Sequence, residues 1–239
     1  MKKALVTGGS GGIGAAVCRR LAADGCHVYI HARSGAQTAQ ALAEAIRGDG
    51  GSAEVLVFDV TDAEAVAAVL EPLVEERPIQ ILVNNAGIHD DVVFPGMSAE
   101  QWHRVMDVSV NGFFNVTRPL MMPMIRSRWG RIINLSSIAA LTGNPGQVNY
   151  AAAKGALNSA TKSLAREVAG RGITVNAVAP GIIDTPMSAP AFDAAEIARI
   201  VPMKRAGSPD EVADLIGFLA SPRAAYITGQ IISINGGMI

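Results

Sequence analysis

Short runs of β-branched and apolar residues alternate along the chain with longer alanine-rich stretches that have helical spacing. The apolar runs predict strands at 4–7, 28–31, 53–58, 79–83, 131–135, 173–178 and 231–234. The helical patterns lie at roughly 13–24, 36–48, 62–76, 98–127, 148–169 and 209–220. Strands that alternate with helices form βαβ units, whose right-handed crossovers build one parallel sheet. We therefore predict an α/β, doubly wound fold of about seven strands with helices on both faces.

The composition fits one large folded domain over residues 1–239, a length that α/β folds reach without a second domain. Hydrophobic residues make up 49% of the chain and charged residues 17%, which argues against disorder. Lys plus Arg number 20 and Asp plus Glu 21, so bulk charge would not hold a nucleic acid. Two cysteines, Cys18 and Cys26, are too few for a disulfide scaffold.

Several features predict a soluble, cytoplasmic protein. No apolar run approaches the roughly 18–20 residues of a membrane helix. The apolar stretch that follows Met1 is too short for a signal peptide. The four histidines are scattered and have no metal-ligand spacing, so we expect no metal site.

One stretch, 180–207, is irregular and rich in proline. Its prolines are Pro180, Pro186, Pro190 and Pro202. It follows the carboxyl end of a predicted strand, where α/β proteins bind ligands, so a loop there could close over a substrate. The alternative is a surface excursion without function.

A glycine-rich turn stands between the first strand and the first helix, where residues 7–14 read Thr-Gly-Gly-Ser-Gly-Gly-Ile-Gly. Glycine allows positive φ and lets the backbone approach a ligand closely. Free N–H groups and the helix dipole favour a phosphate at such a helix start. A glycine cluster alone is weak evidence, but in this position it indicates dinucleotide binding.

The end of the second strand bears on the type of nucleotide. An acidic residue there would bond the adenosine ribose and favour NAD. The chain has Ala32 and then Arg33, and an arginine can pair with a 2′-phosphate, which predicts NADP(H). The alternative is that Arg33 is a solvated surface residue. Asp59, after the third strand, either contacts the adenine amino group or caps the next helix, in competition with Thr61 or Asp62.

Tyr150 and Lys154 stand four residues apart on a predicted helix, so both lie on one face, one turn apart. A nearby ammonium stabilises a phenolate and lowers the pKa of the tyrosine, which suits proton transfer to a carbonyl oxygen. Ser137, after the fifth strand, can donate a hydrogen bond to the same oxygen. The Tyr-x-x-x-Lys spacing alone is common and mostly structural. Its position after the fifth strand, in a chain with a nucleotide-binding turn, favours a catalytic role.

Five motifs occur in order along the chain: Thr7–Gly14, Asn84–Gly87, Ser137, Tyr150-Ala-Ala-Ala-Lys154 and Pro180-Gly181. Together they resemble the classical short-chain dehydrogenases/reductases over essentially the whole chain. Segments 143–150, 163–169, 225–230 and 235–238 look most like the 3-oxoacyl-[acyl-carrier-protein] reductases of that family. Segments 94–98, 122–125 and 202–205 look closer still to the branch that serves aryl-polyene and xanthomonadin-type pigment pathways.

This resemblance implies roles for individual residues. Tyr150 would donate the proton, Lys154 would bond the nicotinamide ribose and lower the tyrosine pKa, and Ser137 would orient the carbonyl. The implied cofactor-binding residues are Thr7, Gly8, Ser10, Gly12, Ile13, Gly14, Arg33, Asp59, Val60, Asn85, Ala86, Gly87, Tyr150, Lys154, Pro180, Gly181, Ile183 and Thr185.

The resemblance also implies NADPH-dependent reduction of a 3-oxoacyl group tethered to an acyl carrier protein, by a homotetramer. Arg128 and Arg171 match the carrier-docking positions of the family, with solvated surface arginines as the alternative. Gln147 and Asn144 are candidate substrate contacts, and a turn role for Gln147 is the alternative. Two other functions stay open: a dehydrogenase of a free alcohol, sugar or steroid, and a non-catalytic cofactor-binding protein.

Two positions depart from the family pattern. Gly11 stands where many relatives carry a basic residue, so one NADP contact is missing and Arg33 must do more. Ser109 stands where relatives usually have an asparagine that belongs to a proton relay. Asn111 lies two residues on, about 200° around the helix, and cannot simply substitute. We expect Ser109 to serve the relay through a shifted or additional water.

Overall fold

The computed structural model describes residues 1–186 and 193–239 and contains one seven-stranded parallel sheet. The strands are β1 (Lys3–Val6), β2 (His27–Ala32), β3 (Ser52–Val57), β4 (Ile79–Asn84), β5 (Gly130–Leu135), β6 (Ile173–Pro180) and β7 (Ile231–Ile234). Their order in the sheet is β3-β2-β1-β4-β5-β6-β7. The predicted fold class and number of strands are confirmed. The order reverses between β1 and β4, the kind of point at which doubly wound sheets bind nucleotides.

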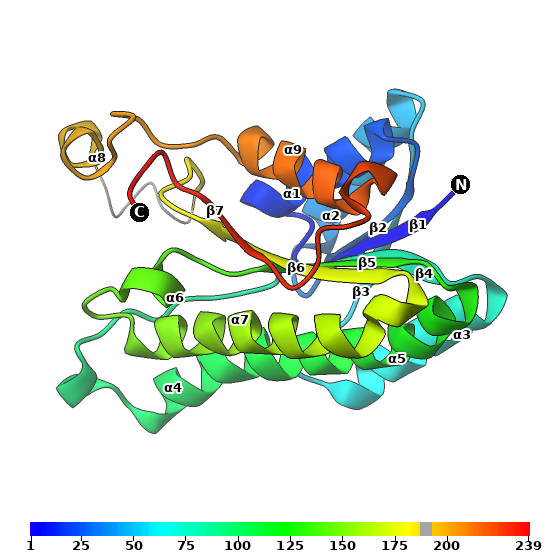
Figure 1. Ribbon diagram of the computed structural model, residues 1–239, viewed down its shortest axis with the longest axis horizontal. Coiled ribbons are helices and arrows are strands. Elements are labelled where there is room, and N and C mark those ends of the chain that lie inside the picture. The colour runs from blue at the N-terminus through cyan, green and yellow to red at the C-terminus, as the bar shows by residue number, and fades with distance from the viewer. Residues whose placement is uncertain (187–192) are drawn as a thin grey trace.

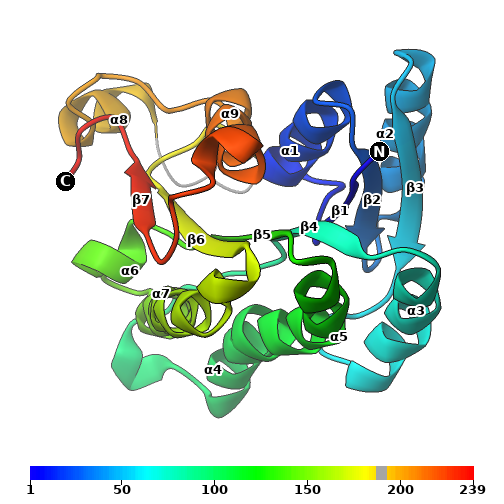
Figure 2. The ribbon, with the colours of Figure 1, turned by 45° about the vertical axis from the view of Figure 1, so that its right-hand side comes forward.

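Helices cover both faces of this sheet. They are α1 (Gly12–Ala23), α2 (Ala36–Gly48), α3 (Ala63–Glu76), α4 (Ala99–Met106), α5 (Gly112–Ser127), α6 (Ala139–Thr142), α7 (Val148–Val168), α8 (Ala194–Ile200) and α9 (Pro209–Ala220). Figures 1 and 2 show α1, α2 and α9 on one face and α3, α5 and α7 on the other. In the described part of the chain, no helix is long and apolar enough to span a membrane.

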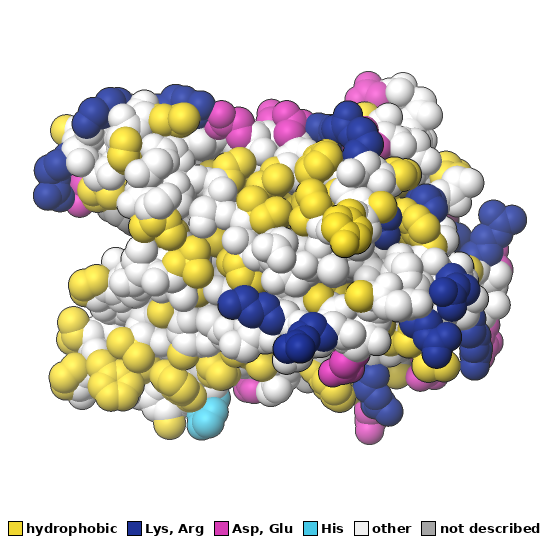
Figure 3. Space-filling view, in the orientation of Figure 1, with side chains coloured by type: hydrophobic (Ala, Val, Ile, Leu, Met, Phe, Trp, Pro, Cys, Tyr) yellow, Lys and Arg dark blue, Asp and Glu magenta, His cyan; other side chains and the backbone are white. Residues whose placement is uncertain are grey.

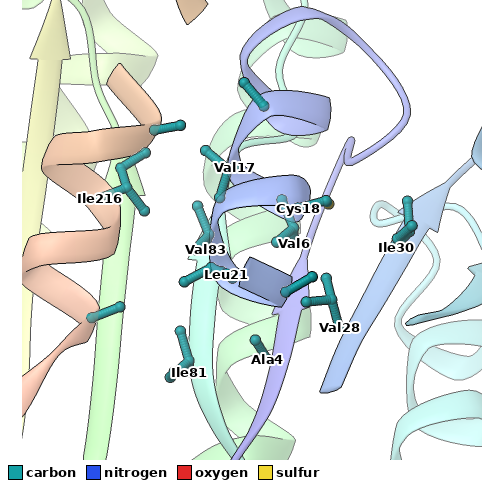
Figure 4. Close-up of a cluster of buried hydrophobic side chains, with 14 of the residues drawn as sticks. Ala4, Val6, Val17, Cys18, Leu21, Val28, Ile30, Ile81, Val83 and Ile216 are labelled. Atoms are coloured by element: carbon teal, nitrogen blue, oxygen red, sulfur yellow. The ribbon is translucent and has the colours of Figure 1, made fainter. Parts of the chain in front are cut away.

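Side chains that alternate along the strands supply two hydrophobic cores, one on each face. On β1, Ala4 and Val6 join the core beneath α1 and α9, whereas Leu5 joins the core beneath α3, α5 and α7. Figure 4 shows the first core, in which Leu21 and Ile216 reach the sheet from the two helices above it. Because both faces are covered, the central strands are buried along their length and mostly apolar, with a few buried polar residues such as Asn134 and Asn176.

Local signals explain where several helices begin. Asp62 caps α3 by accepting hydrogen bonds from the backbone N–H groups of Glu64 and Ala65. Capping boxes begin α4, at Ser98 and Gln101, and α9, at Ser208 and Glu211.

Two segments differ from the prediction. The helix expected over 98–127 is interrupted by a π-helical turn, Asp107–Asn111, that separates α4 from α5. Gly112 follows this turn, and a Cβ there would come within 2.9 Å of the Val60 side chain, so the backbone packs closely. The stretch expected to be irregular, 180–207, contains α8, which Asp193 caps. Pro190, predicted to belong to that loop, lies outside the described residues.

Candidate active site

The carboxyl ends of the parallel strands meet at one edge of the sheet and bring the predicted motifs together. The glycine turn follows β1, the Asn84–Gly87 motif ends β4, Ser137 follows β5 and Pro180 ends β6. These ends point to the left in Figure 1, and Figure 3 shows the same side hollowed between the parts of the molecule that carry α8 and α6.

The glycine turn has the backbone that a phosphate cradle needs. Gly8 and Gly12 have positive φ angles of 61° and 35°. A Cβ on Gly14 would lie 2.3 Å from the carbonyl oxygen of Gly8, so only glycine fits there. Gly11 begins α1 without a side-chain cap, and a Cβ there would meet nothing within 4 Å. The turn therefore leaves room beside Gly11 at the start of α1, which fits a nucleotide phosphate.

Thr7 and Asn85 fasten this turn to β4. The Thr7 hydroxyl oxygen accepts hydrogen bonds from the backbone N–H groups of Asn85 at 3.0 Å and Ala86 at 2.9 Å. The Asn85 side-chain amide donates to the carbonyl oxygens of Thr7 at 2.9 Å and Gly8 at 3.0 Å. The two expected motifs thus hold each other in place across the point where the strand order reverses.

His31 is a second support of the turn, one that the sequence reasoning missed. The backbone N–H of Gly8 donates to His31 Nδ1 at 3.0 Å, so Nε2 carries the hydrogen and donates to the carbonyl oxygen of Phe58 at 2.9 Å. Burial lowers the pKa of His31, which keeps the ring neutral for this arrangement. The available signal was the place of His31 near the carboxyl end of β2, beside the turn.

Arg33 and Asp59 lie together beyond the turn. The guanidinium of Arg33 is 3.7 Å from the Asp59 carboxylate, and its side chain is 62% exposed. A single long contact of this kind is weak, so the guanidinium remains accessible to an incoming 2′-phosphate. Although burial opposes it, hydrogen bonds from Thr61 and the charge of Arg33 hold the pKa of Asp59 below its usual value. Asp59 does not cap α3, because Asp62 does.

Ser137, Tyr150 and Lys154 are brought together as predicted from their spacing. Tyr150 lies in the first turn of α7, and its hydroxyl is hydrogen-bonded to the Ser137 side chain. Lys154 follows one turn later, with its Nζ 5.7 Å from the centre of the Tyr150 ring. The buried ammonium donates to the carbonyl oxygen of Leu135 at 2.7 Å. A Cβ on Gly87 would lie 3.1 Å from this Nζ, so the Asn84–Gly87 motif borders the lysine.

Burial is the largest cause of the pKa shifts of both Tyr150 and Lys154. It raises the pKa of Tyr150, the hydrogen bond with Ser137 opposes the rise, and the charge of Asp91 adds to it. Burial also lowers the pKa of Lys154 to about 8. Lys154 is not among the groups that shift the pKa of Tyr150 here, where its ammonium is bound to Leu135, so its expected lowering of the tyrosine pKa stays a prediction for the cofactor-bound enzyme.

Ser109 lies in the π-helical turn with its hydroxyl buried, and among the described residues it has no hydrogen-bond partner. It lines a cavity of about 10 Å³ together with Thr7, Val60, Asn84 and Ala86, among others. A cavity of that size holds about one water molecule. Asn111 does not replace it, since its side-chain amide donates to Asp107 at 2.7 Å.

The loop after β6 approaches the glycine turn. A Cβ on Gly12 would lie 3.2 Å from the Thr185 side chain, and the backbone N–H of Gly181 donates to the carbonyl oxygen of Ile234 at 2.9 Å. Ile183 pairs with Gly207 in an isolated parallel bridge. Of the expected nicotinamide-side residues, Thr185 therefore borders the phosphate turn.

Comparisons with known proteins agree with this geometry. A family model described as Enoyl-(Acyl carrier protein) reductase matches residues 8–239. The 3-oxoacyl-[acyl-carrier-protein] reductase FabG of Aggregatibacter actinomycetemcomitans is 45% identical over 98% of this chain and 98% of its own length. Proteins of that name from Pseudomonas aeruginosa and Vibrio cholerae are 43% and 44% identical, each over 99% of this chain and 97% of their own length. The chain belongs to the short-chain dehydrogenase/reductase family.

The predicted docking arginines of this short-chain dehydrogenase/reductase lie far from Tyr150 of the same chain. Arg128 ends α5, and its guanidinium donates to the carbonyl oxygen of Gly170 at 3.2 Å, which places it close to Arg171. Both are exposed and precede the amino ends of β5 and β6. Tyr150 lies in the first turn of α7 and the arginines lie near its carboxyl end, so most of this 21-residue helix, which is about 30 Å long, separates them.

The two predicted substrate contacts have partners within the protein. The Asn144 side-chain amide donates to Gln147 Oε1 at 2.9 Å, and Gln147 Nε2 donates to Asp91 at 2.8 Å. Gln147 is also the residue at which α7 begins. Both residues thus lie beside the first turn of α7, three to six positions before Tyr150.

Proposed function

We propose that this chain is an NADPH-dependent 3-oxoacyl-[acyl-carrier-protein] reductase that works in the cytoplasm as one domain. The observation that carries the proposal is the Ser137–Tyr150–Lys154 group beside an open, uncapped glycine turn. The full-length identity of 45% to a reductase so named supports the choice of substrate. An intact proton donor argues against a merely cofactor-binding protein.

The geometry of each side chain supports the roles that the family resemblance implies. NADPH, when bound, supplies the hydride that reaches the 3-keto carbon. The Tyr150 hydroxyl gives its proton to the carbonyl oxygen, which turns the ketone into a hydroxyl and leaves a phenolate. Ser137 donates a hydrogen bond to the same oxygen, and the Lys154 ammonium stabilises the phenolate. Ser109 and the small cavity beside it would hold a water that helps to return the proton.

NADPH oxidation tests this proposal when three substrates are compared: a 3-oxoacyl group on an acyl carrier protein, a free ketone, and a 2-enoyl group on the same carrier. We expect the first to have the highest kcat/KM. Preference for the free ketone would identify a dehydrogenase of small alcohols, sugars or steroids. Preference for the enoyl thioester would favour the activity named in the description of the family model.

Arg33→Ala is expected to raise the KM for NADPH by about ten- to a hundredfold. A charge-assisted hydrogen bond contributes about 1.5–3 kcal/mol, and Arg33 is exposed beside the turn. NADH lacks the 2′-phosphate and serves as the internal control, so its KM should change little. Equal losses with both cofactors would refute the assignment of Arg33.

Arg128 and Arg171 are proposed to dock the acidic carrier protein, because a chain with a net charge of −1 needs a local positive patch for it. Since α7 separates them from Tyr150 of their own chain, they would serve a neighbouring copy in the proposed homotetramer. Arg128→Glu with Arg171→Glu should lower kcat/KM on the carrier-bound substrate at least tenfold and spare a small thioester mimic. Arg19→Glu, an exposed charge on α1, is the matched control. Parallel losses on both substrates would argue against docking.

The pathway is proposed more coarsely, as fatty-acid or polyketide-type biosynthesis. Within this class we propose the aryl-polyene branch, on the resemblance of segments 94–98, 122–125 and 202–205. Turnover of carriers loaded with saturated and with polyunsaturated 3-oxoacyl chains would distinguish the two.

A further inference from the structure

The segment between β4 and α4 carries a chain of hydrogen-bonded side chains that ends at the first turn of α7. His89 Nδ1 lies 3.1 Å from Asp91 Oδ1, and Gln147 Nε2 donates to Asp91 Oδ2 at 2.8 Å. The Asn144 side-chain amide then donates to Gln147 Oε1 at 2.9 Å. Asp91 therefore links the segment after β4 directly to the residue that begins the helix of Tyr150.

Two further contacts fasten the same helix end. The side chain of the buried Asn149 donates to the carbonyl oxygen of Asp90 at 3.0 Å, and its Oδ1 accepts the backbone N–H of Tyr150 at 2.8 Å. The backbone N–H of Val92 donates to the carbonyl oxygen of Gly146 at 2.8 Å. The segment after β4 thus positions the turn that carries the tyrosine, and Asp91 is the member whose carboxylate bonds Gln147.

The two neighbouring carboxylates of this segment have different surroundings. Asp90 binds Arg104 and Gln101 on α4, which balances its charge. Asp91 is 44% exposed, and its described ionic partner is His89 alone. The lysine of the site, Lys154, donates to Leu135. Other titratable groups on the elements around the first turn of α7 are Glu100, His103 and Asp107, whereas α6 contains none.

We propose that Asp91 is a positioning residue for the reduction: it tethers the first turn of α7 through Gln147 and places a negative charge beside the turn that carries Tyr150. A ketone reduction must begin with a phenol and not a phenolate. The carboxylate raises the pKa of Tyr150 in addition to burial, and so opposes the stabilisation of the phenolate by Ser137. The inference rests on the proposed role of Tyr150 as the proton donor.

Asp91→Asn separates the charge from the tether, because an amide keeps the hydrogen bond from Gln147 and loses the negative charge. We expect kcat at neutral pH to stay within about twofold of wild type, and the alkaline limb of the pH profile to move to lower pH. On that limb kcat should fall about twofold to fivefold below wild type, the effect of a partly exposed charge. Asp90→Asn removes the adjacent charge and should leave the limb in place.

Asp91→Leu removes both the charge and the tether, so kcat should fall about tenfold or more at every pH, as misplacement of a catalytic group does. An alkaline limb of Asp91→Asn that coincides with wild type would overturn the charge effect. Wild-type kcat in Asp91→Leu would overturn the tether.

A second measurement does not depend on the substrate. The chain has three tyrosines, so the phenolate absorbance of wild type minus that of Tyr150→Phe reports the titration of Tyr150 alone. The same difference in the Asp91→Asn background should titrate at lower pH. This shift can be observed even if the chain reduces some ketone other than a 3-oxoacyl thioester. An unchanged titration would refute the inference whatever the substrate is.

Discussion

Tyr150→Phe is expected to lower kcat by about 10²–10⁴-fold, the contribution of a positioned general acid, while the Kd for NADPH stays within about twofold. Phenylalanine keeps the ring, which packs in the first turn of α7, and removes the one hydroxyl that can give a proton. Ser137 loses a hydrogen-bond partner but still accepts from the backbone N–H of Ala139 at 3.2 Å, so the local fold should persist.

Steady-state kinetics with a 3-oxoacyl thioester and calorimetric titration with NADPH measure these two quantities. Tyr226→Phe is the matched control, because Tyr226 is fully exposed, at 102% relative accessibility, and lies away from the catalytic group. A Tyr150→Phe variant with near-normal kcat would mean that the proton comes from another residue.

The sheet and the main motifs could be predicted from the sequence because each depends on local patterns that repeat. Parallel strands buried on both faces need mostly apolar, β-branched runs, and such runs lie where β5 and β6 form. Once strands and helices alternate, the topology places every strand end at one edge. The contact of Ser137 with Tyr150 followed from that placement.

The π-helical turn could not be predicted, because residues 98–127 have one continuous helical pattern. It is followed by the close packing of Gly112 against Val60, two residues 52 positions apart in the sequence, which a local pattern does not reveal. Ser109 therefore lies beside a cavity that no local pattern indicates. In the same way, the support of the glycine turn by His31 is a contact between strands, and sequence spacing does not reveal it.

The raised pKa of Tyr150 also could not be predicted from the sequence. The four-residue spacing to Lys154 places the two side chains on one face but does not say where the ammonium points. In the structure it donates to Leu135, and burial is the largest cause of both pKa shifts.

Lys154→Met should therefore have opposite effects on activity and on stability. Methionine keeps most of the aliphatic stem and removes the ammonium, so kcat should fall by about 10²-fold or more, because the phenolate loses its stabilising charge. The burial that lowers the pKa of Lys154 from 10.5 to about 8 makes the charged lysine costly to the folded state. This pKa difference corresponds to roughly 3 kcal/mol of stability that the substitution should recover. Loss of the hydrogen bond to Leu135 offsets about 1 kcal/mol of that gain.

The direction of the stability change follows from how the free energy of unfolding depends on pH. Below about pH 8 the lysine is protonated in both the folded and the unfolded chain, so the full cost is present. Between about pH 8 and 10.5 the unfolded chain binds more protons than the folded one, and the free energy of unfolding of the wild type should rise with pH.

Denaturant unfolding at pH 7 should thus find Lys154→Met more stable than wild type by about 1–3 kcal/mol, with the gap closing toward pH 10.5. Lys162→Met, an exposed lysine on the same helix, should change little at either pH. A wild-type stability that falls across this window in parallel with Lys154→Met would mean that the ammonium is solvated, and that burial does not set the proton equilibrium of the site.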